Sequence, residues 1–310
     1  MGDLPEHRVT SARVFLNSGV DYAGPFKVKI SCNVTGKAHL CLLVCFAIKA
    51  VHLELVMSAT TEAFLNALKR FIARKGKVLN IYSDNGATFI GANNELWDLQ
   101  NLLRSKDPQS KVHIFLTDNS INWRFIPASS PHMGGLWEAA VKSAKTHLRK
   151  VMGSSLLTFE ELTTVFVQIV ACLNSRPLIP MSSDPTEFTV LTPGHLIICE
   201  SLTCIPEDDL REVPENRLTR FQHLIQIKQH FWSKWSQDYL THLQHRSKWT
   251  SVQSQRIKPG TMVVLQDKDL PPMKWHLGRV IEMHQGKDGL TRVVSVQTKH
   301  DVTKRALNKI

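Results

Sequence analysis

The sequence lacks long apolar runs. No stretch approaches the ~20 consecutive apolar residues that a membrane-spanning helix needs. The first residues, Met-Gly-Asp-Leu-Pro-Glu-His-Arg, contain no secretory apolar core, and position 6 is Glu where a myristoylation signal requires Ser or Thr. We therefore expect an intracellular protein with no membrane partner.

Cysteine is also scarce. The six cysteines show neither Cys-x-x-Cys pairs nor zinc-finger spacing. Cys41, Cys45 and Cys172 lie in apolar stretches, where a free cysteine acts as a small core residue. His242 and His245 could share a helix face, yet no cysteine lies near them. We expect reduced thiols, no disulfide framework and no zinc.

Acidic residues are few in the last third of the chain. The formal net charge is +11, and residues 215–310 hold 17 Lys and Arg against 7 Asp and Glu, a net charge of 17 − 7 = +10. Residues 1–214 are nearly neutral. This distribution is typical of a polyanion-binding module attached to a neutral domain. A basic surface that only aids solubility is the alternative interpretation.

Hydrophobic periodicity predicts a layered α/β unit in the first half. The expected elements are three strands between residues 20 and 56, a helix at 60–76, a strand at 78–83, a helix at 94–104, a strand at 123–126, and helices at 136–152 and 158–174. Residues 177–214 are rich in proline and indicate an extended connector. A helix is expected from residue 217, followed by a small β-barrel built from runs at 260–265, 275–283 and 290–298.

Three acidic residues are candidates for a metal-binding catalytic site. Asp21 lies in a strand-like run, Asp84 follows the predicted strand 78–83, and Glu138 opens the predicted helix 136–152. Hard divalent cations such as Mg²⁺ take oxygen ligands, so carboxylates that converge would hold such ions. The pattern favours a site that transfers phosphodiester bonds.

The helix that begins near Leu136 carries a basic stripe behind its acid. Glu138, Lys142, Lys145 and Arg149 follow one another at steps of four, three and four, which places them on one helix face. A metal at the acid and a DNA backbone along the stripe would explain the pattern. Taken alone, Glu138 and Lys142 could also be an ordinary ion pair on a solvated face.

Three motifs resemble the catalytic core of retroviral-type integrases. They are residues 20–26 (Val-Asp-Tyr-Ala-Gly-Pro-Phe), 83–89 (Ser-Asp-Asn-Gly-Ala-Thr-Phe) and 132–138 (His-Met-Gly-Gly-Leu-Trp-Glu). The Gly-Gly-Leu-Trp-Glu form is similar to the branch found in BEL/Pao LTR retrotransposons. Residues 173–178, 182–185 and 191–195 match that branch as well, and the resemblance extends over residues 14–300.

The resemblance implies an α/β fold with an RNase H-like catalytic core, a five-stranded mixed sheet flanked by helices, followed by a long helix and a small SH3-like β-barrel. The implied organisation is an N-terminal tail (1–13), the core (14–178), an extended connector (179–216), a helical segment (217–250) and a basic DNA-binding barrel (251–310). The family's N-terminal zinc-binding module is expected to be missing from this chain. Asp84 and Glu138 are 138 − 84 = 54 positions apart, a longer separation than in retroviral enzymes.

The resemblance also implies the chemistry. Asp21, Asp84 and Glu138 would form the Asp-Asp-Glu site of a polynucleotidyl transferase, holding two Mg²⁺ or Mn²⁺ ions for DNA 3′-end processing and strand transfer. The implied partners are the element's DNA ends, target DNA, further copies of the chain and chromatin, and a DNA substrate implies a nuclear location. The residues of the implied active-site loop are Pro131, His132, Gly134 and Gly135.

The resemblance further implies DNA contacts, which would give salt-sensitive affinity with little sequence preference. In the core these are Asn85, Lys142, Lys145 and Arg149. In the C-terminal region they are Arg246, Lys248, Arg256, Lys258, Lys274, Arg279 and Arg292. Trp232, Trp235 and Trp249 could stack on bases, although their helical spacing favours a place in the core.

Two other functions compete with the integrase interpretation. One is a domesticated or truncated relic that only binds DNA or chromatin. The other is an RNase H-like nuclease that cuts RNA–DNA hybrids, against which the integrase-type C-terminal half argues. A binding module has no physical need for three converging carboxylates, so the sequence favours the enzyme.

Overall fold

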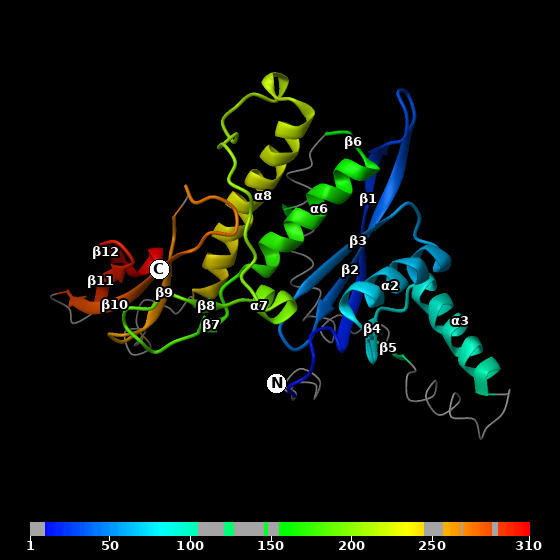
Figure 1. Ribbon diagram of the computed structural model, residues 1–310, viewed down its shortest axis with the longest axis horizontal. Helices are drawn as coiled ribbons and strands as arrows, with labels where there is room; N and C mark the ends of the chain where they lie inside the picture. Colours follow the sequence, from blue (N-terminus) through cyan, green and yellow to red (C-terminus); the bar gives the residue numbers. More distant parts are fainter. Residues whose placement is uncertain are drawn as a thin grey trace. The chain divides into compact units, whose positions relative to one another are not determined.

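The computed structural model describes residues 10–104, 121–126, 146–147, 155–244, 257–267, 269–286 and 291–310. The chain divides into two compact units, Met1–Leu173 and Asn174–Ile310 (Figure 1). No helix among the described residues is both long enough and apolar enough to cross a membrane.

A mixed β-sheet forms the centre of the first unit. Its strands are β1 (Asn17–Lys29), β2 (Thr35–Cys45), β3 (Val51–Val56), β4 (Asn80–Ser83) and β5 (Asn122–Phe125), in the spatial order β3-β2-β1-β4-β5. The first three strands are antiparallel, whereas β4 is parallel to β1 and β5 is parallel to β4. A two-residue strand, β6 (Leu157–Thr158), pairs with the end of β1. This order confirms the expected RNase H-like fold class.

Helices cover both faces of this sheet. The β1–β2 register turns Tyr22 and Phe26 to opposite faces. The Tyr22 ring contacts Phe64 of α2 (Thr61–Lys75), with ring centroids 6.3 Å apart. The Phe26 ring contacts Phe166 of α6 (Phe159–Asn174) at 5.4 Å. Helices α2 and α6 therefore lie on opposite sides of the sheet.

Helix α2 begins and ends where its sequence indicates. The Thr60 hydroxyl accepts the N–H of Ala63 at 3.3 Å as an N-cap, and the Gly76 N–H donates to Ile72 at 2.8 Å at the other end. Gly76 has φ +82°, a conformation that favours glycine. The predicted helix at 60–76 is confirmed.

Helix α3 (Ala87–Arg104) begins seven residues before the expected position 94. The reason lies in the turn before it, where the Asp84 carboxylate accepts the Gly86 N–H at 3.0 Å. Phe89 and Ala92 are then buried on its inner side. The predicted helix at 136–152 lies outside the described residues, apart from positions 146–147.

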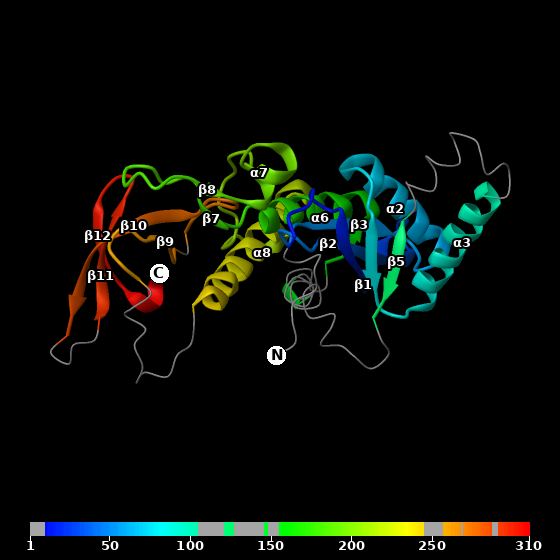
Figure 2. The ribbon, with the colours of Figure 1, turned by 90° about the horizontal axis from the view of Figure 1, so that it is seen from below.

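The second unit combines a long helix with a small antiparallel sheet (Figure 2). Helix α8 (Arg220–Leu243) is followed by a sheet of order β12-β11-β10-β9 whose core contains Leu265, Val280, Val294 and Val296. The strands are β9 (Met262–Leu265), β10 (His276–Gln285), β11 (Thr291–Thr298) and β12 (Val302–Ala306). The SH3-like sheet is confirmed, with β12 as a strand that the sequence pattern did not predict.

Residues of the expected connector are packed into the second unit. They include a hairpin of β7 (Ile179–Pro180) and β8 (Val190–Leu191), the unpredicted helix α7 (Pro193–Ile198) and the short 3-10 helix η2 (Glu215–Arg217). The Trp275 indole N–H donates to the Ser175 carbonyl at 2.9 Å, and the Tyr239 hydroxyl donates to the Pro177 carbonyl at 2.9 Å. These bonds join the connector to β10 and α8.

The two tryptophans of α8 belong to the core, whereas Phe221 at its start is exposed. Trp232 is 4% exposed and Trp235 is 6% exposed, and both rings contact Trp275. The core interpretation of these two tryptophans is confirmed, whereas Trp249 lies outside the described residues. Lys228, the polar interruption in the helix pattern, is buried against Glu207 of the connector.

Candidate active site at the ends of two parallel strands

Asp21 and Asp84 stand at the same level of two neighbouring parallel strands. The pairing of β1 with β4 places Gly19 opposite Tyr82. Asp21 follows Gly19 by two positions within β1, and Asp84 follows Tyr82 by two positions, directly after the last residue of β4. Equal steps along neighbouring strands, roughly 4.8 Å apart, keep two residues level and on the same face. The register therefore places the backbones of Asp21 and Asp84 at neighbouring positions of the sheet.

Buried amides fix the register that makes the two acids level. The Asn80 side-chain amide donates to the Asn17 side-chain oxygen at 2.6 Å, and the Asn122 amide donates to the Asn80 oxygen at 3.4 Å. The three residues lie in β4, β1 and β5. Asn17 and Asn80 are buried, whereas Asn122 is exposed. Because a slipped strand would leave the two buried amides without partners, the ladder disfavours other registers. Sequence analysis missed this ladder.

The Asp84 carboxylate is held by the turn that follows it. Its Oδ1 accepts the Gly86 N–H at 3.0 Å, the geometry of an Asx turn. A Cβ atom at position 86 would lie 3.1 Å from that oxygen, so a side chain there would press against the carboxylate. Asp84 itself is exposed. The turn thus orients the carboxylate and leaves it open to solvent.

Asn85 fastens this turn to the neighbouring strand. Its side-chain amide donates to the Ile126 carbonyl at 3.0 Å. Two residues earlier, the Ser83 hydroxyl accepts the Trp123 indole N–H at 2.9 Å. The ends of β4 and β5 are therefore cross-linked beside the acid. The predicted DNA contact of Asn85 stays a prediction.

The Asp21 carboxylate is half-buried and close to its own backbone. Its Oδ1 accepts the Tyr22 N–H at 2.6 Å. A register irregularity follows in β1 between Ala23 and Phe26, where Gly24 has φ +124°. Bulges of this kind bend a strand and are common beside active sites. Asp21 shares the sheet face of Phe26, the α6 face.

Two neighbours of Asp21 stay protonated at neutral pH. Burial, with the nearby Cys41 sulfur, raises the pKa of Tyr22 well above its usual range. Burial also raises the pKa of the Cys41 thiol, and the charges of Glu54 and Asp21 add to this effect. None of the described cysteines forms a disulfide with another described residue, and Cys41, Cys45 and Cys172 are buried as predicted.

Several predicted site residues lie outside the described residues. Among the described ones, no group of three His, Cys, Asp or Glu side chains could hold a metal ion. The level pair of Asp21 and Asp84 is a donor set of hard oxygens, which fits Mg²⁺ or Mn²⁺, with Glu138 as the predicted third ligand. The predicted site residues that lie outside are Glu138, Pro131, His132, Gly134, Gly135, Lys142, Lys145, Arg149, Arg246, Lys248 and Arg256.

The predicted phosphate contacts of the second unit differ in exposure. Lys258, Lys274 and Arg292 are exposed, as a phosphate contact requires. Arg279 is 6% exposed, and its guanidinium donates to the carbonyls of Ser182, Gly260 and Glu187 at 2.8, 3.1 and 3.3 Å. The structure thus corrects this residue to an internal cross-link between β10 and the connector.

Exposed basic residues on β12 were missed. Lys304 and Arg305 lie on this edge strand, and both are exposed. The two basic residues are visible in the sequence Val-Thr-Lys-Arg-Ala, but its apolar and polar residues alternate too little to predict a strand. They extend the basic surface of the second unit.

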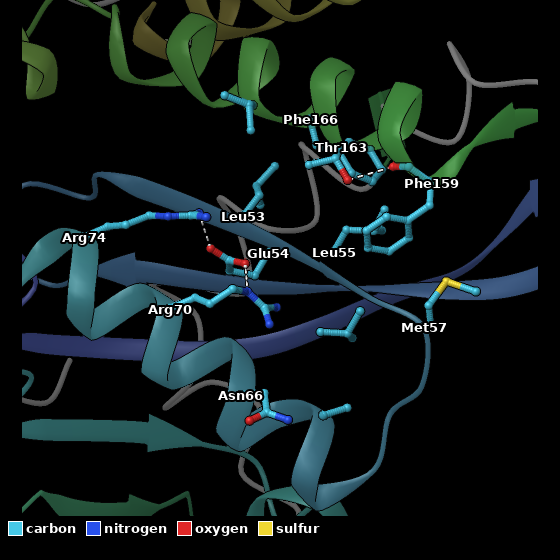
Figure 3. Close-up of a pocket in the computed structure, with 13 residues that line it drawn as sticks. Leu53, Glu54, Leu55, Met57, Asn66, Arg70, Arg74, Phe159, Thr163 and Phe166 are labelled. Atoms are coloured by element: carbon cyan, nitrogen blue, oxygen red, sulfur yellow. Dashed lines mark hydrogen bonds and ion pairs between the residues drawn. The ribbon is translucent and has the colours of Figure 1, made fainter.

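A pocket of about 450 Å³ lies elsewhere on the first unit (Figure 3). Strand β3, α2 and α6 line it, with Glu54 at its base. The Glu54 carboxylate accepts from Arg70 at 2.8 Å and from Arg74 at 2.7 Å. These arginines occupy the oxygens that a cation would need, so the strand ends fit a metal better than this pocket.

Comparisons with known proteins give a partial family match and a distant structural likeness. Residues 219–310 match a family of unknown function, DUF5641. No curated protein sequence matches the chain. The simian T-cell lymphotropic virus intasome, in complex with PP2A regulatory subunit B56 gamma, is 13% identical with a TM-score of 0.40, over 99% of this chain and 81% of that one. The HTLV-2 integrase catalytic core domain in complex with magnesium, dimeric form, is 18% identical with a TM-score of 0.32, over 52% of this chain and 88% of that one.

Proposed function

We propose that the chain is a DDE-type polynucleotidyl transferase, an integrase of the BEL/Pao retrotransposon type that trims DNA 3′ ends and joins them to target DNA. The observation that carries this proposal is the shared level of Asp21 and Asp84 on adjacent parallel strands. Two carboxylates at neighbouring positions of a sheet offer the oxygen ligands that a hard divalent cation takes.

Asp21 and Asp84, with Glu138, would hold Mg²⁺ or Mn²⁺. When bound there, a pair of such ions would supply activation of the attacking oxygen and stabilisation of the leaving oxygen in an in-line displacement. The chain itself aims the carboxylates. The Gly86 N–H orients Asp84, and the Tyr22 N–H orients Asp21.

The second unit would bind the DNA backbone. Residues 215–310 of this unit hold 17 Lys and Arg against 7 Asp and Glu, and the exposed basic residues there include Lys258, Lys274, Lys304 and Arg305. Contacts to phosphates release counterions, so binding weakens steeply as salt rises. Assembly with further copies of the chain, contact with chromatin and a nuclear location belong to the same proposal.

The second candidate function is DNA or chromatin binding without catalysis. The concentration of positive charge in residues 215–310 favours it, because this feature needs no carboxylates. The two candidates differ in what they require of the strand ends. Only the enzyme depends on Asp21 and Asp84.

The test combines the full chain, Mn²⁺ and an end-labelled DNA duplex. We expect 3′-trimmed or joined products that disappear in Asp84→Asn and Asp21→Asn, while DNA binding is kept. Asp98→Asn is the matched control, because Asp98 is exposed on α3 away from the strand ends. Salt-sensitive binding without products would support the second candidate. Cleavage of RNA–DNA hybrids alone would indicate a nuclease.

A further inference from the structure

An aromatic stack links the two segments that carry the site's carboxylates. Tyr22 follows Asp21 in β1, and Phe89 lies on the first turn of α3, five positions after Asp84. Their rings are stacked, with centroids 5.4 Å apart and planes at 15°. Successive strand residues face opposite sides of a sheet, so the stack lies behind Asp21.

Neighbouring rings enclose this stack. Phe64 of α2 meets Tyr22 edge-on at 6.3 Å and Phe89 edge-on at 5.2 Å. Trp123 of β5 contacts Phe89 at 6.2 Å. Phe64 is fully buried, and Phe89 is 3% exposed. Close packing on several sides leaves the two stacked rings little freedom to slide.

Short backbone links run from the stack to each carboxylate. On β1, the Tyr22 N–H donates to the Asp21 Oδ1 at 2.6 Å. On the other segment, the Phe89 N–H donates to the Gly86 carbonyl at 2.9 Å, and the Gly86 N–H donates to the Asp84 Oδ1 at 3.0 Å. A displacement of either ring would therefore shift a carboxylate, because only one or two hydrogen bonds separate each ring's backbone from it.

We infer that the Tyr22–Phe89 stack positions Asp21 and Asp84 at the separation that a shared divalent cation requires. This inference rests on the proposed function, since it concerns the same carboxylates. Mg²⁺ requires near-ideal geometry with ligand distances of roughly 2.0–2.1 Å, so small shifts of a carboxylate weaken binding. Tyr22 and Phe89 are positioning residues, because they act through the acids.

The Tyr22 hydroxyl helps to separate the role of the ring from that of its polar atom. This oxygen is buried and has no hydrogen-bond partner among the described residues. A buried hydroxyl without a partner destabilises a fold. Tyr22→Phe keeps the stacked ring and removes that oxygen, so it should preserve cation binding and raise the melting temperature.

The test is a Mn²⁺ titration of the full chain without DNA, in which isothermal titration calorimetry measures the affinity. We expect Phe89→Leu and Tyr22→Leu to weaken Mn²⁺ binding by about 10-fold, the lower end of the range for residues that support metal ligands. Tyr22→Phe should bind like the wild type. Phe125→Leu is the matched control, because Phe125 stacks on Trp123 in the same cluster.

Each outcome decides the matter. Wild-type affinity in both leucine variants would overturn the inference and leave the proposed function standing. So would equal losses in Phe125→Leu that follow the melting temperature, since these would reflect stability alone. If Phe89→Leu fails to fold, the pair Tyr22→Leu and Tyr22→Phe decides. A wild-type chain that binds no Mn²⁺ would remove the proposed function itself, before any variant is compared.

Discussion

Glu54 and Asp84, two acids of the first unit, occupy opposite settings. Glu54, in β3, is 5% exposed, and its carboxylate lies within 3.0 Å of His52, 2.8 Å of Arg70 and 2.7 Å of Arg74. Asp84 is exposed at the end of β4, where a backbone N–H orients it. The Glu54 carboxylate bonds to other side chains of the fold, whereas the Asp84 carboxylate stays accessible to a ligand.

The second unit repeats this contrast with basic residues. Arg279 is buried, and internal carbonyls accept its N–H groups, whereas Lys274, five positions earlier, is exposed. Charge alone does not identify a functional side chain. What distinguishes the two classes is whether the protein has already supplied the partner.

The largest effect on stability is expected for Arg279→Ala. The change removes a buried guanidinium that donates to three carbonyls, so we expect a loss of about 3 kcal/mol in the free energy of unfolding, the upper end of the range for hydrogen bonds to a charged group. Urea unfolding followed by fluorescence would measure it. Lys274→Ala is the control and should stay within about 0.5 kcal/mol. If Arg279→Ala kept its stability and lost DNA affinity, the cross-link assignment would be wrong.

Glu54→Gln should have the next largest effect. Arg70 and Arg74 would lose their anionic partner, but both are partly exposed, so we expect a loss of about 2 kcal/mol rather than the larger cost of a fully buried pair. Asp84→Asn should change the free energy of unfolding by less than about 0.5 kcal/mol while it abolishes catalysis. Equal destabilisation by both substitutions would erase the contrast between the two acids.

The Glu54 contribution should depend on pH. Burial raises the pKa of its carboxyl, but the hydrogen bonds from His52 and Arg70 outweigh burial, so the pKa is lowered on folding. The stabilisation is thus present above the unfolded pKa of roughly 4.3 and is lost as pH falls through the folded pKa. The stability difference between wild type and Glu54→Gln, measured by urea unfolding between about pH 7 and about pH 3, should shrink at the acidic end. A constant difference would contradict this.

The smallest effect on stability is expected on β12. Replacing Lys304 and Arg305 by alanine should change stability by less than about 0.5 kcal/mol. It should also lower the slope of log affinity against log salt by about 2, roughly one for each lost phosphate contact. DNA binding measured by fluorescence anisotropy over a salt series would show this. An unchanged slope would remove β12 from the basic surface.

Much of the first unit could be predicted because its signals are local. Apolar runs rich in Val, Leu and Cys predicted β2 and β3, and Thr60 and Gly76 marked the ends of α2. The start of α3 was placed seven residues late because it depends on the Asp84 turn and on the burial of Phe89. Such contacts leave no periodic trace in a sequence.

The elements and roles that escaped prediction depend on distant partners. Strand β12 is largely exposed and charged, and it is a strand because its backbone pairs with β11. The arginine at position 279 reads as a surface cation until the connector covers it. The motifs identified Asp21 and Asp84, yet the amide ladder that keeps them level joins residues 63 positions apart.

The hydrogen bonds of Trp275 and Tyr239 bear on how the C-terminal half can be studied separately. A fragment that starts at Thr219, where the DUF5641 match begins, would lack Ser175, Pro177 and Ser182. The side-chain donors that now bond to their carbonyls would lose those acceptors. A fragment that starts at Asn174 keeps every one of these acceptors. We therefore expect the longer fragment to be soluble and to elute as a single folded species in size-exclusion chromatography. The shorter fragment should aggregate.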